Sequence, residues 1–282
     1  MKIKITADST CDLTREYAEA HGVTIIPLKV NLNGRDYSDG VDITPEDIFR
    51  EVGQGCDLPK TSAINTEEFR KTFRALLKDC DAIIHFDISS DFSSCYANAV
   101  VASEGLPVRC IDSRNLSTGI GLLIAEAVDM VEAGCGDPQA IVERVNSLVD
   151  KVDASFIIDR LDYLHKGGRC SAVTLLGANV LKLKPCIEVA DGRMIVGKKY
   201  RGQFARCVKQ YIGDRLKDLD KIDSRRIFLV HTGFNAQLTD DIKAELAALN
   251  VFGEILEARA GSTISSHCGD TTLGIMYLRK EP

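Results

Sequence analysis

The sequence predicts an α/β protein made of two domains. Its 282 residues are enough for one large or two medium domains. The first half alternates short apolar runs with helix-patterned segments, and the connections change in character near Asp153. Strands that alternate with helices form a mostly parallel sheet flanked by helices. We therefore expect an N-terminal α/β domain over residues 1–153 and a C-terminal α+β domain over residues 154–282.

Apolar runs of strand length recur through the first half of the chain. The predicted strands are Ile3 to Ala7, Thr24 to Val30, Ala82 to Ile88 and Val108 to Ile111. Helical periodicity is found at Thr14 to His21, Thr66 to Cys80, Ser94 to Glu104 and Thr118 to Ala133. Another helix starts after Thr44, which can act as its cap, because Pro45 suits the first helical turn and acidic residues follow.

The second half contains a hairpin followed by mixed strands and helices. A helix from Pro138 to Asp150 leads into a strand, Ala154 to Ile158. The Asp191-Gly192 pair lies between apolar strands within Pro185 to Tyr200, which is a strong hairpin signal. The remaining predicted elements are helices at Ser171 to Leu181, Gln203 to Leu216 and Leu238 to Leu249, and strands at Arg226 to His231, Phe252 to Glu257 and Gly274 to Arg279.

Composition excludes several classes of protein. A formal net charge of −6 argues against a general nucleic-acid binder, so any anion site must be local. The N-terminus reads as a strand and not as a signal peptide, and no apolar run approaches the ~18 residues that span a bilayer. The ten cysteines are scattered without a C-x-x-C pair, which favours a reduced, cytoplasmic protein with no metal site.

Two glycines and two basic residues follow one another in the segment Tyr163-Leu164-His165-Lys166-Gly167-Gly168-Arg169. Glycines allow backbone N–H groups to converge on an anion, and an arginine can bind carboxylate or phosphate oxygens in a bidentate manner. The alternative is a helix C-cap with Gly167 in the left-handed conformation and solvated basic side chains. The segment alone leaves both interpretations open.

Neither nucleotide-binding motif is complete. The run Gly192 to Lys199 has lysine where a P-loop needs Ser or Thr, and it lies within the predicted hairpin. The run Gly119 to Ile124 has isoleucine at the third glycine position of a dinucleotide fingerprint. A nucleotide site within this chain is therefore disfavoured.

Hydroxyl side chains cluster in three further loops, residues 59–65, 88–96 and 261–269. Open α/β sheets bind ligands where parallel strands end and helices begin, so the three loops are candidates for one shared pocket. Each loop taken alone is more typical of Ser or Thr capping a helix.

These segments together resemble the DegV family of bacterial fatty-acid-binding proteins. The resemblance is carried by Asp8-Ser9-Thr10-Cys11-Asp12-Leu13, the Thr61-Ser62 turn, Ile88-Ser89-Ser90, the Gly-Gly-Arg segment with Ser171, and residues 261–267, in order along the whole chain. It implies a two-domain protein that holds a long-chain fatty acid in an apolar tunnel near the domain junction. It also implies a carrier, not itself an enzyme, that presents the carboxylate to a separate ATP-dependent fatty acid kinase subunit and exchanges its ligand at the membrane, with no other cofactor.

The resemblance also implies roles for individual residues. Thr61 and Ser93, with their neighbours Ser62 and Ser94, match the hydroxyls that bind the fatty-acid carboxylate. His267 matches the histidine at the same head group. Arg169 and Arg201 match arginines that support phosphoryl transfer.

The sequence departs from the family pattern at two places. Ser94-Cys95 stands where many members have Gly-Thr, and Asp270 follows Gly269 where a Gly-Pro-Gly-like turn is usual. The second change puts an acid near the expected pocket mouth, where it would repel an acyl phosphate.

Two other functions remain to be weighed. The first is a stand-alone phosphotransferase or hydrolase that uses His267 with a hydroxyl from Ser93, Ser262 or Ser266 as nucleophile. The second is a regulatory interaction module without a lipid.

Overall fold

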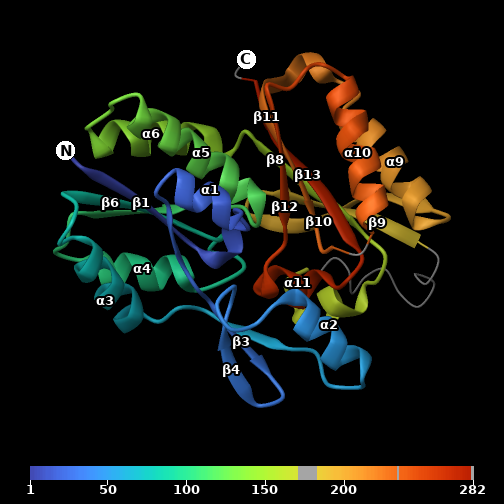
Figure 1. Cartoon of the computed structure of the whole chain (residues 1–282), viewed down its shortest axis with the longest axis horizontal. Helices are drawn as coiled ribbons and strands as arrows, with labels where there is room; N and C mark the ends of the chain where they lie inside the picture. Colours follow the sequence, from blue (N-terminus) through green and yellow to red (C-terminus); the bar gives the residue numbers. More distant parts are fainter. Residues whose placement is uncertain (171–182, 234, 281–282) are drawn as a thin grey trace.

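A computed structural model describes residues 1–170, 183–233 and 235–280 of the chain. The N-terminal sheet has the strand order β2-β1-β6-β7 and all its pairs are parallel, as predicted. Its strands are β1 (Ile3–Asp8), β2 (Thr24–Ile26), β6 (Ala82–Asp87) and β7 (Val108–Asp112). Its helices are α1 (Arg15–Ala20), α3 (Thr66–Leu76), α4 (Cys95–Ser103), α5 (Thr118–Glu132) and α6 (Pro138–Val149). Helices α3 and α4 cover one face of the sheet, and α5 and α6 the other (Figure 1).

The C-terminal sheet is mixed and has the order β10-β9-β8-β13-β11-β12. Its strands are β8 (Val152–Ile158), β9 (Leu183–Ala190), β10 (Arg193–Arg201), β11 (Ile222–His231), β12 (Glu254–Arg259) and β13 (Thr272–Arg279). Only β11 and β12 pair in parallel. Helices α9 (Phe204–Arg215) and α10 (Ala236–Ala248) lie on the outer face (Figure 1). The expected combination of a parallel α/β part and an α+β part is confirmed.

A small third sheet lies below the other two in Figure 1 and corrects one prediction. It contains β3 (Lys29–Leu32), β4 (Arg35–Ser38) and β5 (Lys60–Ser62), all antiparallel, and lies near α2 (Pro45–Gly53). The single strand predicted from Thr24 to Val30 is wrong, because β2 and β3 belong to different sheets. Pro27 stands between them, and its missing N–H interrupts a strand ladder.

Two turns rest on residues with positive φ. Asp191 (φ 50°) and Gly192 (φ 78°) join β9 to β10, which confirms the hairpin. Helix α7 (Asp162–Gly167) ends at Gly168, which is left-handed with φ 69° and donates its N–H to the carbonyls of Leu164 and His165. The prediction that Gly167 would be the left-handed cap is therefore wrong by one residue.

Helix α5 is buried between the two large sheets. Every residue from Thr118 to Val128 is buried, and α5 contacts β1 on one side and β13 on the other. One continuous apolar core therefore extends from Ile84 in the first sheet to Met276 in the second. Strand β8 begins just before residue 153, where we propose the domain boundary, so Val152 and Asp153 already belong to the second sheet.

Three further expectations concern the helix predicted after the Gly-Gly-Arg segment, membrane-spanning helices and the cysteines. The helix predicted from Ser171 to Leu181 lies outside the described residues. Within the described part of the chain, no helix is both long and apolar enough to cross a membrane. All ten cysteines carry free thiols.

Candidate functional site

A narrow cavity of about 50 Å³ lies between the loops that follow the N-terminal strands and the C-terminal helix α11 (Ser262–Cys268). Five of the seven predicted site residues line it, namely Thr61, Ser62, Ser93, Arg169 and His267. They come from β5, from the loop after β6, from the segment after α7 and from α11. The remaining lining is largely apolar, including Ile88, Phe92, Met194 and Ile264.

A second small cavity continues the first toward the C-terminal sheet. It has a volume of about 20 Å³ and shares Leu116, Ile264 and Cys268 with the first cavity. Its wall includes Phe156 and Met276, from β8 and β13. The two cavities together follow a path from the hydroxyl and imidazole groups of the first to a second cavity in which apolar residues such as Phe156, Val230 and Met276 outnumber polar ones.

His267 is the central polar group of the first cavity. Its Nε2 lies 2.8 Å from Thr61 Oγ1. Its Nδ1 is buried and has no hydrogen-bond partner among the described residues. Burial, with the positive charge of Arg169 nearby, lowers the pKa of His267 to about 4. The imidazole is therefore neutral at neutral pH, with one ring nitrogen able to donate and the other able to accept.

Gly167 forms the wall behind this imidazole. A Cβ atom at position 167 would lie 2.3 Å from His267 Nδ1, so only glycine fits there without displacing the ring. Arg169 Nη1 donates a hydrogen bond of 2.7 Å to the carbonyl of Gly167, which folds the arginine back over the turn. The Gly-Gly-Arg segment thus ends a helix, as the capping interpretation predicts, and Gly167 also borders the His267 ring.

Helix α11 is capped by two carboxylates from the N-terminal half. Its N-cap residue is Gly261, which has no side chain to bond the first amides. Asp12 Oδ1 accepts from Gly261 N at 2.8 Å, and Asp39 accepts from Ser262 N at 2.7 Å and Thr263 N at 3.2 Å. The helix that presents His267 is therefore fixed by residues more than 200 positions away.

Sequence reasoning assigned no role to Asp12 or Asp39. Asp12 belongs to the Asp8-to-Leu13 segment that carries the resemblance, which was a usable signal. Asp39 stands in an ordinary Ser-Asp-Gly turn, and only its position in the folded chain reveals its role. Burial strongly raises the pKa of Asp12, and hydrogen bonds from Ser117 and Gly261 oppose that rise.

A second buried network joins β1 to the loop after β6. Asp8 accepts from Thr10 N at 2.9 Å and from Ile88 N at 2.8 Å, and burial raises its pKa to about 6. Asp8, Asp87 and Cys95 offer ligand-type atoms within 4.8 Å of one another. All three side chains are completely buried, and burial raises the pKa of the Cys95 thiol, which keeps that thiol protonated.

The other predicted site residues have different positions. Ser93 Oγ accepts from Cys95 N at 3.2 Å at the start of α4. Ser94 is exposed outside the cavity lining and has φ −83°, a conformation that serine adopts freely, so the family's glycine is not needed there. Arg201 is exposed at the end of β10, also outside the lining.

Two of the three serines considered as nucleophiles donate their hydroxyls to backbone carbonyls. Ser262 Oγ donates to the carbonyl of Ile43 at 3.1 Å, and Ser266 Oγ donates to the carbonyl of Ser262 at 2.7 Å. Both are buried. Among the described residues, the hydroxyl bonded to His267 is that of Thr61.

Comparisons with known proteins give one consistent result. A family model described as an uncharacterised protein of the DegV family matches residues 2–280. A DegV domain-containing protein of Caldanaerobacter subterraneus is 31% identical over 284 residues, 99% of each chain. Among solved structures, a fatty-acid-binding DegV family protein from Thermus thermophilus has a TM-score of 0.91 and 27% identity, covering 99% of this chain and 100% of that one. A stearic acid-binding protein from Eubacterium ventriosum has a TM-score of 0.87 and 28% identity, covering 99% and 98%.

Proposed function

Because the chain belongs to the DegV family, we propose that it binds one long-chain fatty acid along the path formed by the two cavities. The observation that carries this proposal is the change in chemistry along that path. Thr61, Ser93 and His267 supply hydrogen-bonding groups at one end, and Phe156 and Met276 supply apolar surface at the other. Solved relatives described as fatty-acid-binding proteins share the fold.

The polar end suits a carboxylate because its donors are already assembled. The Thr61 hydroxyl and one nitrogen of His267 can both turn toward an oxyanion that enters the cavity. Hydrogen bonds to a charged group contribute roughly 1.5–3 kcal/mol each, so two or three would fix the head group. An anion beside His267 also raises the pKa of this histidine, which opposes the lowering caused by burial and Arg169.

The apolar path must widen to accept an acyl chain. The cavities measure about 50 and about 20 Å³. Pockets for drug-sized ligands typically measure ~300–1,000 Å³. Movement of the shared side chains Leu116 and Ile264 would join the two cavities, because these residues line both.

We further propose that the bound carboxylate is presented to a separate ATP-dependent kinase subunit, which forms the acyl phosphate in the cytoplasm, and that the ligand is exchanged at the membrane. Arg169 supports this role because it lines the cavity and is also exposed at the surface, where a partner subunit could reach it. Its guanidinium would offset the charge added by phosphorylation. Arg201 is exposed as well but does not line the cavity, so it would act on the head group only when the kinase subunit is bound.

A stand-alone phosphotransferase or hydrolase is disfavoured by the same geometry. A general base works best with a pKa near the working pH, and the pKa of His267 is about 4. His267 Nδ1 has no orienting carboxylate among the described residues, and the candidate nucleophiles Ser262 and Ser266 bond backbone carbonyls. The third candidate, Ser93, accepts from Cys95 N, and the hydroxyl beside His267 Nε2 is that of Thr61. A purely regulatory function is disfavoured because it does not explain the two cavities and their change from polar to apolar lining.

Thermal unfolding with added ligand tests the proposal. Palmitate or oleate should raise the melting temperature, because a ligand that binds only the folded state stabilises it. Thr61→Val removes the hydroxyl bonded to His267 and should weaken binding about ten-fold. Thr72→Val on α3, outside the cavity lining, is the matched control. Equal affinity of wild type and Thr61→Val would remove Thr61 from the head-group site.

A further inference from the structure

The second cavity ends against the inner face of the C-terminal sheet. Phe156 on β8, Gly274 on β13 and Val230 on β11 are paired directly across three neighbouring strands. Directly paired residues of antiparallel strands point to the same face of a sheet. Phe156 and Val230 both line the cavity, and Gly274 has no side chain between them. The row therefore contains a gap with an apolar side chain on each side.

The residues around this gap form a fixed end wall. A Cβ atom at position 274 would lie 2.9 Å from Phe156 Cβ, well inside the ~3.5–4.0 Å that separates packed carbon atoms. Phe156 is buried and is the largest apolar side chain of the lining. The neighbouring Met276 accepts a hydrogen bond of 3.2 Å on its sulfur from Thr118 Oγ1. Phe156 and Met276 together close the cavity on the side of the sheet.

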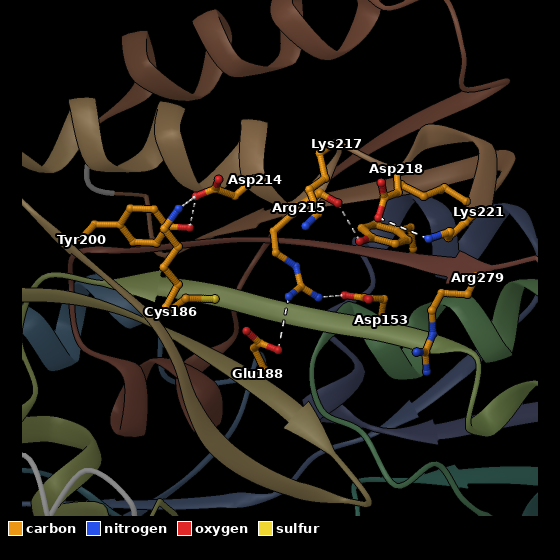
Figure 2. Close-up of a pocket in the computed structure, with 13 residues that line it drawn as sticks. Asp153, Cys186, Glu188, Tyr200, Asp214, Arg215, Lys217, Asp218, Lys221 and Arg279 are labelled. Atoms are coloured by element: carbon orange, nitrogen blue, oxygen red, sulfur yellow. Dashed lines mark hydrogen bonds and ion pairs between the residues drawn. The ribbon is translucent and has the colours of Figure 1, made fainter.

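The other face of the same sheet is unsuited to hydrocarbon. A groove of about 360 Å³ opens there, beside the C-terminal end of α9, and shares no lining residue with the two cavities. Figure 2 shows the guanidinium of Arg215 between Asp153 and Glu188, with which it forms ion pairs. Successive residues of a strand point to opposite faces, so Asp153 faces this groove and Phe156 faces the cavity. A hydrocarbon chain in the second cavity therefore ends at the sheet.

The hydroxyl groups that line the second cavity already have partners within the protein. Ser117 Oγ donates to a carboxylate oxygen of Asp12. Thr272 Oγ1 donates to the carbonyl of Cys268 at 2.9 Å, and Thr232 Oγ1 accepts from Thr272 N at 3.1 Å. A ligand hydroxyl would have to break one of these bonds to obtain a partner.

The imidazole of the second cavity is engaged in the same way, in contrast to that of the first. His231 Nδ1 accepts from Gly233 N at 2.9 Å, and its Nε2 lies 3.2 Å from Glu257. In the first cavity, His267 Nδ1 and Thr263 Oγ1 are buried without a hydrogen-bond partner among the described residues. No such atom belongs to the described lining of the second cavity. Of the two cavities, only the first therefore has hydrogen-bonding capacity left for a ligand.

We propose that Phe156 sets where the acyl chain ends, and that the second cavity accepts only an unsubstituted methyl end. The inference rests on the proposed function, because it assigns the far end of the same ligand. A hydroxyl at the end of the chain would be buried here without a partner, which corresponds to a loss of roughly 5- to 150-fold in affinity. A methyl end meets only contacts of its own kind along Phe156, Val230 and Met276.

Displacement of the fluorescent fatty acid cis-parinaric acid from the full chain tests the methyl end. Palmitate and ω-hydroxypalmitate have the same length and the same carboxylate, and they differ only in the terminal hydroxyl. We expect palmitate to bind about ten-fold more tightly. Equal affinities would overturn this inference and leave fatty-acid binding intact. A failure of palmitate to displace the probe would contradict the proposed function and this inference together.

A series of saturated fatty acids, namely laurate, myristate, palmitate, stearate and arachidate, tests the position of the end wall. Phe156→Leu shortens the wall, so the length that binds most tightly should increase, by roughly four-fold in affinity for each further methylene that is buried. Phe73→Leu removes the same atoms from α3, outside both linings, and should keep the wild-type preference.

A second variant moves the preference in the opposite direction. Ala260 lines the same cavity, so Ala260→Val should fill part of it and favour shorter chains. This variant provides the answer if Phe156→Leu does not fold. An unchanged length preference in the folded variants, or an equal change in Phe73→Leu, would overturn the role of Phe156.

Discussion

Thr61 Oγ1 and His267 Nε2 lie 2.8 Å apart, although 206 positions separate the two residues in the sequence. The contact joins the small third sheet to helix α11 at the polar end of the cavity. Each residue is the partner of the other in the described structure, so a ligand carboxylate would replace or share this bond. The position of the His267 ring therefore decides whether the head group can bind.

Gly167→Ala should displace that ring and weaken fatty-acid binding about ten-fold. The added Cβ would lie 2.3 Å from His267 Nδ1, closer than packed atoms come. Gly168→Asn is the matched control, because its Cβ meets no atom within 4 Å and asparagine tolerates a φ of 69°. Titration of both variants with oleate checks the prediction. Equal affinities would show that the ring position is unimportant.

His267 should make the protein less stable in mild acid. Its pKa is about 4 in the folded chain and about 6.5 in the unfolded chain, so the unfolded state binds the proton more tightly between these pH values. The contribution of His267 to the free energy of unfolding is complete above pH ~6.5 and is lost as the pH falls toward ~4. The loss amounts to roughly 2 kcal/mol between pH 7 and pH 5.

Urea unfolding of wild type and His267→Asn at these two pH values isolates that contribution. The difference between the two proteins should change by roughly 2 kcal/mol, because groups such as Asp8 act equally in both. Parallel pH profiles would contradict a neutral, buried His267.

Asp39→Asn should destabilise the fold by about 1–3 kcal/mol. Both carboxylate oxygens of Asp39 accept hydrogen bonds, from Ser262 N on one side and from Thr263 N and Ser9 Oγ on the other. An amide nitrogen cannot accept from either set. Asp240→Asn, at an exposed position of α10, serves as the control for loss of charge. Equal midpoints of unfolding for the two variants would mean that α11 needs no cap from Asp39.

Arg169→Ala should reduce phosphorylation by a partner kinase more than it reduces fatty-acid binding. Its side chain is exposed, and its hydrogen bond goes to the Gly167 carbonyl, so it leaves the Thr61–His267 pair intact. The two quantities are measured as oleate affinity and as the rate of ATP-dependent acyl phosphate formation. An equal loss in both would place Arg169 among the carboxylate ligands.

Local patterns in the sequence were sufficient for most strands and helices. The Asp191-Gly192 turn and the Thr44 cap were predictable because their chemistry lies within a few residues, and both are present in the structure. The break at Pro27 was missed because the apolar run continues across it. Strand β4 was missed because Arg35–Ser38 contributes no residue to the buried core.

Helix α11 was missed for a different physical reason. Its sequence, Ser-Thr-Ile-Ser-Ser-His-Cys, consists almost entirely of weak helix formers. Its N-terminal amides are bonded by Asp12 and Asp39, and contacts over such distances leave no local pattern. The grouping of Thr61, Arg169 and His267 was likewise suggested by the family resemblance, because no spacing in the sequence connects them.

Identification of the molecule that co-purifies with the protein tests the central claim most directly. The freshly isolated full chain would be denatured and its organic extract analysed by mass spectrometry, with a Gly167→Ala preparation alongside. We predict about one long-chain fatty acid per chain from wild type and clearly less from the variant. An extract without any acyl chain, from a protein that palmitate and oleate also fail to stabilise, would contradict the account.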